Sequence, residues 1–257
     1  MASEQETGAN QPNESANPPD SARQGAVSRV IGALVSPRAT FESIAERPTW
    51  VFPLVLIIVV GFLFVFSFSQ RIGWRTVLEK QLATNSAFNS LSPQQQQQQI
   101  DRVVRLAPIA GYAGTTVGSA IILLIIAALY LGVFNIVFGT AIKFKQSFGV
   151  SIHAYLPLVV KSLVGLLIVW VRPPEGVSLQ KLVMSNVGAF LPSSSPAWLI
   201  TFGSFLDIFV FWTLALLGIG YAAESGKKLK VGTALSVVVV VWFIFVIGAV
   251  GLTAIRG

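Results

Sequence analysis

The chain has no cysteine and only one histidine among its 257 residues. The lack of cysteine excludes disulfide bonds, thiolate catalysis and cysteine-ligated metals. Because a zinc site typically needs about three or four His, Cys or carboxylate ligands, a single histidine also argues against most metal centres. The sequence therefore predicts neither a metal nor a cofactor.

Charged residues are also scarce. They make up 11% of the chain and hydrophobic residues 53%, against roughly 25% charged residues in an average soluble domain. So little polar surface cannot cover a water-soluble globule, and the apolar residues come in long blocks. The sequence predicts an all-α polytopic membrane protein. The net charge of +7 comes from basic residues at the ends of these blocks, which favours flanking loops over a nucleic-acid surface.

Motifs for common enzyme chemistry are missing as well. The sequence has no G-x-x-x-x-G-K-[ST] and no G-x-G-x-x-G at a strand-to-helix turn, which excludes the usual nucleotide cradles. The predicted spans hold a single aspartate, Asp207, and a protease with paired intramembrane carboxylates needs two, so this class of enzyme is excluded. We therefore expect a protein that is not an enzyme.

Five apolar blocks reach the length of about 20 residues needed to cross a hydrocarbon core of about 30 Å. They lie at 50–69, 117–138, 149–171, 197–221 and 231–255. Each should be a helix, because a spanning segment must satisfy its own backbone hydrogen bonds. The sequence thus predicts a five-span domain at 50–255, preceded by a disordered tail at 1–25 that is rich in Asn, Gln, Pro, Ser and Glu.

Residues 26–49 form two short amphipathic helices before the first span. Pro37 starts the second helix, Phe41 and Ile44 share one of its sides, and Pro48 ends it. Because arginines occupy the other side, we expect these surface helices to lie along the membrane. The alternative is a helical pair packed on the bundle.

The connection at 70–116 is long and polar and carries two amphipathic stripes, one on each side of six consecutive glutamines. It predicts an extramembrane helical hairpin. The two short lysine-rich loops, FGTAIKFKQSFG and AAESGKKLKVG, favour the cytoplasmic side, which places the amino terminus in the cytoplasm. Several arginines of the 70–116 connection then lie outside, but long loops count less in this rule.

A lysine stands in the middle of the third span, in YLPLVVKSLVGLLIVWV. A charge deep in a bilayer needs a partner, a wet cavity or a function. Lys161 lies about 18 Å from one membrane face and Asp207, in the antiparallel fourth span, about 15 Å from the other. Both fall near the midplane, so the two residues are expected to pair.

Two interpretations of this intramembrane ion pair remain open. The pair either fixes the register of the two helices or borders an aqueous route that takes up a proton or counter-ion. His153 and Tyr155, earlier on the third span, are possible polar neighbours.

The segment SPRATFESIAERPTW carries the pattern S/N-P-x-x-T-F-x-x-I-x-x-x-P, with Pro37, Thr40, Phe41, Ile44 and Pro48 at its defining positions. It resembles the bacterial branch of the Yip domain family, whose name refers to yeast Ypt/Rab-interacting relatives. Further similar stretches are SFSQRIGW, YLPLVVKSLVG, SFLDIFVFWTLALLGIGY and KKLKVGTAL.

The resemblance implies a five-span fold with a cytoplasmic amino terminus, in the inner membrane of a bacterium. Eukaryotic relatives bind Rab GTPases in vesicle traffic, but the D-L-Y-G-P type motif before their first span is absent here, so Rab binding is not carried over. Two functions remain. One is a non-enzymatic organiser of the lipid bilayer, of membrane-protein partners or of a homo-oligomer. The other is a small transporter that uses Lys161 and Asp207.

Overall fold

The computed structural model describes residues 25–83, 86–173, 181–192, 194–226 and 228–256, so nearly all of the predicted tail lies outside the described residues. The described residues form helices and connecting segments, with one isolated antiparallel bridge between Asn186 and Asp207. The all-α prediction is confirmed. The elements are α1 (Ala26–Val35), α2 (Pro37–Glu46), α3 (Val51–Arg71), α4 (Trp74–Ala83), α5 (Ser86–Asn89), α6 (Pro93–Ala113), the π-helical η2 (Gly114–Gly118), α7 (Ser119–Phe138), α8 (Phe144–Ala154), α9 (Leu156–Val171), the 3-10 helix η5 (Val187–Phe190), α10 (Ala197–Phe205), α11 (Ile208–Glu224) and α12 (Val231–Arg256).

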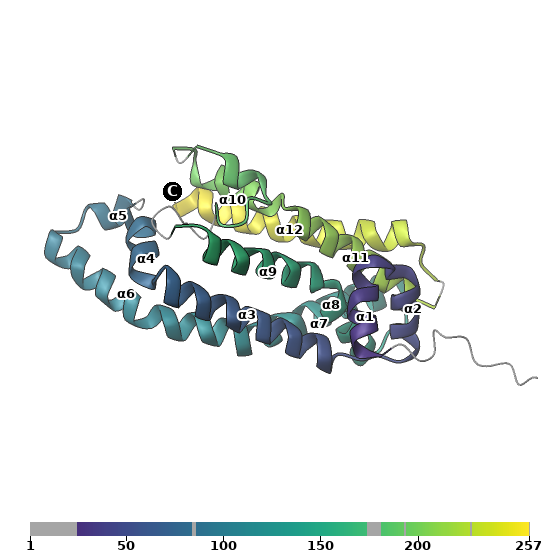
Figure 1. Ribbon diagram of the computed structural model, residues 1–257. Coiled ribbons are helices and arrows are strands. Elements are labelled where there is room, and N and C mark those ends of the chain that lie inside the picture. The colour runs from purple at the N-terminus through teal and green to yellow at the C-terminus, as the bar shows by residue number, and fades with distance from the viewer. Residues whose placement is uncertain (1–24, 84–85, 174–180, 193, 227, 257) are drawn as a thin grey trace, which may run out of the picture.

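Long helices lie side by side and define the axis of the bundle (Figure 1). Among the described residues, four helical runs are long and apolar enough to cross a membrane: Val51–Arg71, Pro93–Phe138, Phe144–Val171 and Val231–Ile255. The predicted fourth span differs. It is divided into α10 and α11, so the expectation of one continuous helix at 197–221 is wrong.

Helices α1 and α2 cross one end of the bundle, which we call the amino-terminal end (Figure 1). Phe41 and Ile44 of α2 have no exposed surface and pack into the core formed with α7, α8, α11 and α12. The contact with α11 is close, because a Cβ on Gly220 would stand 2.5 Å from Val150 and 3.0 Å from Phe41. The apolar side of α2 is therefore covered by protein, as in the packed alternative.

Tyr221 of α11 stands at the centre of this core. Its ring stacks on Phe134 with centroids 4.6 Å apart. Its hydroxyl lies 2.6 Å from Ser147 Oγ and 3.2 Å from Ser151 Oγ, so the one polar atom of a fully buried tyrosine has partners. These contacts join α7, α8 and α11.

At the opposite end, which we call the hairpin end, α4 packs beside α6, and α5 packs against α4 (Figure 1). Ser92 and Gln95 form a capping box at the start of α6, and Pro93 occupies its first turn. The glutamines that follow are mostly exposed on this helix. Arg75 of α4 binds both Glu79 and Asp101, which ties α4 to α6.

Candidate functional site: an ion pair at an interrupted helix

Asp207 lies where the predicted fourth span is interrupted. Leu206 and Asp207 leave the helical conformation between α10 and α11, with Asp207 at φ −118° and ψ 134°. The Asp207 carboxylate accepts a hydrogen bond from Phe209 N at 2.8 Å through Oδ1, the bond of a helix N-cap. Aspartate favours this position because its side chain satisfies an amide that has no partner within the helix. The same residue that carries the charge therefore starts α11.

The other carboxylate oxygen binds two donors. Lys161 Nζ of α9 lies 2.6 Å from Asp207 Oδ2, and Ser185 Oγ donates to the same oxygen at 2.6 Å. The Asp207 side chain has no exposed surface, whereas 31% of the Lys161 side chain is exposed. Charge-assisted hydrogen bonds of this kind are roughly twice as strong as neutral ones. The structure thus brings the two predicted partners together and adds Ser185 as a third group.

The segment before α10 completes this site. Val187 N donates to Leu206 O at 3.2 Å, and Ile208 N donates to Ser185 O at 3.1 Å. These bonds satisfy backbone groups that the interruption frees, as an apolar environment requires. Close packing makes them possible, because a Cβ on Gly188 would stand only 2.7 Å from Ile200 O, and one on Gly203 2.7 Å from Gly188 N.

Predictions from the sequence include neither the interruption nor a structural role for residues 181–192. One signal was present. An aspartate directly before an apolar run is a typical N-cap, so Asp207 before IFVFW could have indicated a helix start at Ile208. Nothing in the sequence marked Ser185 among the other serines of that connection.

The predicted polar neighbours lie apart from the pair. His153 is fully buried and its Nδ1 lies 2.8 Å from Gly149 O. Tyr155 lines a separate cavity between α3, α7 and α9. Among the described residues, no hydrogen bond joins either of them to Lys161 or Asp207. The described residues also contain no group of three or more His, Asp or Glu side chains that could hold a metal ion.

The motif residues of 26–49 position the amino-terminal helices. Pro37 occupies the first turn of α2, and Pro48 lies beyond its end. Thr40 is 1% exposed, donates through Oγ1 to Ser36 O at 3.0 Å and packs against α1 at Gly32. Together with the buried Phe41 and Ile44, these residues form the docking face of α2.

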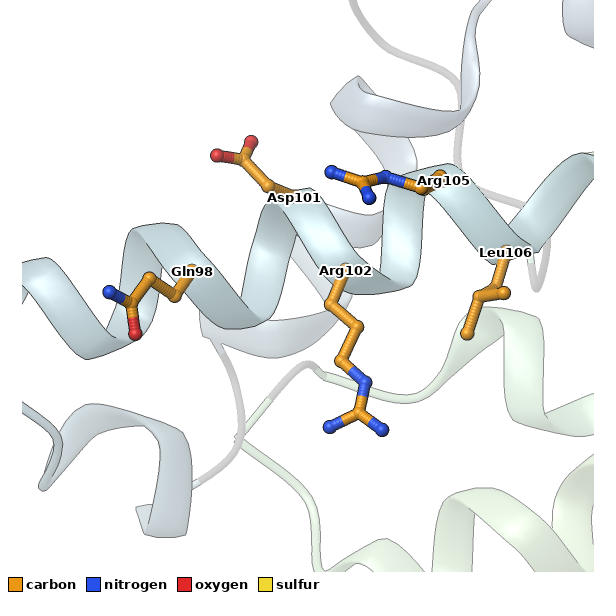
Figure 2. A pocket seen from close by; sticks show the side chains of 5 residues that line it. All are labelled: Gln98, Asp101, Arg102, Arg105 and Leu106. Atoms are coloured by element: carbon orange, nitrogen blue, oxygen red, sulfur yellow. The ribbon is translucent and has the colours of Figure 1, made fainter.

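A surface hollow of about 530 Å³ lies along α6 at the hairpin end. Figure 2 shows that Arg102 extends to the side of α6 opposite Asp101 and Arg105. Asp101 is held by Arg75 and by Gln97, the latter at 3.1 Å. Neither Lys161 nor Asp207 lines this hollow or the cavity between α3, α7 and α9.

Comparison with known proteins adds the family. The model of the Yip1 domain matches residues 31–252, which is most of the chain and includes both members of the ion pair. Searches of curated proteins and of solved structures gave no match. With its apolar helices and this match, the chain is an integral membrane protein that belongs to the Yip1 domain family.

Proposed function

We propose that this protein is a non-enzymatic organiser of the membrane or of partner proteins, and that α1 is its contact surface. In this proposal the amino-terminal end of the bundle faces the cytoplasm and the protein resides in a bacterial inner membrane. The short lysine-rich loops support this orientation. The exposed apolar side of α1 is the observation that carries the proposal.

Helix α1 uses only part of its apolar surface within the protein. Val30 and Ala33 are buried against the bundle, while Val27, Ile31 and Val35 are 57%, 54% and 72% exposed. The three exposed residues are spaced by four and therefore form one stripe along the helix. Unlike α3 or α12, α1 is not long enough to span a bilayer. Its stripe is thus available to the headgroup region or to a protein.

The anchoring of α1 makes this stripe a defined surface. Arg29 is 5% exposed, and its Nη1 donates to Arg47 O at 2.7 Å and to Thr49 Oγ1 at 3.1 Å. Burial lowers the pKa of Arg29, and the charge of Arg47 adds to this effect, but an arginine side chain stays protonated in proteins. With α2 fixed in the core beneath it, α1 is held in one orientation.

In this proposal the Lys161–Asp207 ion pair has a structural role. Asp207 is fully enclosed and both its oxygens accept hydrogen bonds from the chain itself. A carboxylate with these partners holds α9, α11 and the 181–192 segment together, and buried polar groups of this kind can specify one arrangement of helices.

Photocrosslinking in native membranes tests the proposal. A photoreactive amino acid at Ile31, on the stripe, should give protein or lipid adducts, whereas the same amino acid at the buried Ala33 should give adducts only within the chain. If both positions give the same intramolecular products, the contact surface is wrong.

A second candidate function is transport of a proton or small ion. The observation in its favour is that Lys161 is partly exposed beside an interrupted spanning helix, an arrangement that occurs at the binding sites of secondary transporters. Proteoliposomes with a pH-sensitive or ion-sensitive dye test it. If the original protein gives more flux than empty vesicles and Asp207→Asn does not, the result favours transport over the organiser function. If the original protein, Asp207→Asn and empty vesicles all give the same flux, transport through the ion pair is excluded.

A further inference from the structure

A second irregular place lies on the other side of α9. An open cavity of about 270 Å³ is lined by α3, η2, the start of α7, and α9. This exceeds the roughly 150 Å³ of an apolar protein cavity that binds benzene. The cavity belongs to segments that span the membrane, so its contents come from the bilayer or from water.

Small residues leave this space open. Gly61 of α3 faces Thr115 of η2, where a Cβ on the glycine would stand 3.3 Å from Thr115 Cβ. Gly114 also lines the cavity, and a Cβ built there would meet no atom within 4 Å. The π-helical turn that holds Gly114 and Thr115 is a rare element, found frequently at functional sites.

Three hydroxyl groups in the wall, those of Thr115, Ser119 and Ser162, are turned toward their own helices. Thr115 Oγ1 donates to Gly111 O at 3.1 Å, Ser119 Oγ to Thr115 O at 2.8 Å, and Ser162 Oγ to Leu158 O at 2.9 Å. Their protons are therefore not available to a ligand. The rest of the wall is mainly Ile, Leu and Val side chains, together with Tyr155. A buried water needs about two to four polar partners, and this wall favours hydrocarbon instead.

The mouth of the cavity continues into the surface that faces lipid. Ile122 lines the cavity and is 55% exposed. Beside it along the chain, Val117 and Ile121 are 62% and 49% exposed, and Phe62 on α3 is 42% exposed. Because these residues lie on spanning helices, the bilayer covers them. A lipid chain can thus pass from this surface into the cavity without crossing a polar layer.

We propose that the cavity between α3, η2–α7 and α9 binds an acyl chain of a bilayer phospholipid. The site is independent of the ion pair and of the surface formed by α1. A bound chain would fill the space that Gly61 and Gly114 leave and would contact three helices at once.

A photoactivatable lipid tests this site in the full-length protein. The probe is phosphatidylcholine with a diazirine in its acyl chain, incorporated in phosphatidylcholine vesicles that hold the purified protein. We expect adducts on residues 57–61, 114–123 and 155–162 at a level above that on the lipid-facing Phe243 of α12. Equal labelling of these regions and of Phe243 would overturn the proposal, because a cavity filled with water or empty would give no enrichment.

Two glycine variants provide a matched pair. Gly114→Leu fills the cavity and should reduce its adducts roughly tenfold, a change in occupancy that corresponds to about 1.4 kcal/mol of binding free energy. Gly132→Leu makes the same change in α7 at a position that also has no atom within 4 Å but does not line the cavity. It should leave the adducts unchanged, and equal adducts in both variants would overturn the proposal.

A further variant covers the case in which Gly114→Leu fails to fold. Ser162→Met narrows the cavity from α9 and should also reduce the adducts. Full labelling of a folded Ser162→Met protein would contradict an acyl-chain site.

Discussion

The break between α10 and α11 and the π-helical η2 both depart from regular α-helix, and they differ in what surrounds them. At Leu206 and Asp207 the side chains of Lys161 and Ser185 bind the Asp207 carboxylate. Backbone groups of the 181–192 segment bind the backbone groups that the interruption frees. At η2 the chain continues as a helix, but small side chains leave a cavity beside it. The first departure is held by strong polar contacts, while the second has a cavity beside it. Irregular backbone in a membrane protein can therefore serve either cohesion or binding.

Removal of the Asp207 carboxylate should have the largest effect on the interruption between α10 and α11. Asp207→Ala leaves Lys161 without its counter-charge, Ser185 without its carboxylate acceptor and α11 without its cap. Breaking a buried ion pair costs about 3–5 kcal/mol, and we expect about 3 kcal/mol because part of Lys161 is exposed. The free energy of unfolding in detergent micelles measures this. A loss below about 1 kcal/mol, the contribution of a cap alone, would show that the pair does not hold the bundle.

A methyl group at Gly188 should weaken the same region without a change of charge. Its Cβ would stand 2.7 Å from Ile200 O and from Ser204 Oγ, and overpacking costs about 1–3 kcal/mol. Gly248→Ala is the control, since nothing lies within 4 Å of a Cβ there. Equal melting temperatures for the two variants would show that the contact between 181–192 and α10 is loose.

Reversal of both charges separates attraction from capping. Lys161→Asp with Asp207→Lys should be more stable than either single change, because opposite charges still meet. It should remain about 1 kcal/mol less stable than the original protein, since a lysine cannot accept the bond from Phe209 N. If the double variant loses as much free energy of unfolding as the two single variants together, attraction between the two charges does not stabilise this region.

The π-helical turn η2, which has a cavity beside it, should tolerate a larger side chain. Gly114→Leu should leave the free energy of unfolding unchanged or raise it by up to about 1 kcal/mol, because leucine favours a helix more than glycine does. The same unfolding experiment measures it in detergent without added lipid. A marked loss of stability would mean that the cavity beside η2 is smaller than described, and that η2 is packed as tightly as the break between α10 and α11.

The interruption at Asp207 and the cavity beside η2 also show how much of the structure can be predicted from the sequence. The pairing of Lys161 with Asp207 follows from charge and depth, because only one acidic residue lies deep in any predicted span. The interruption at Asp207 does not follow, since hydropathy averages over the two residues that leave the helix. The cavity is invisible for another reason. Gly114 and Gly118 have the spacing typical of close helix packing, yet a Cβ on Gly114 meets nothing, and only the arrangement of three helices shows where space remains.

Helices α6 and α7 form one uninterrupted run of 46 residues through η2. At 1.5 Å per residue such a rod is roughly 69 Å long, more than twice the thickness of a hydrocarbon core of about 30 Å. The run is therefore much longer than a single crossing requires, and its polar, glutamine-rich start is the part expected outside the hydrocarbon core.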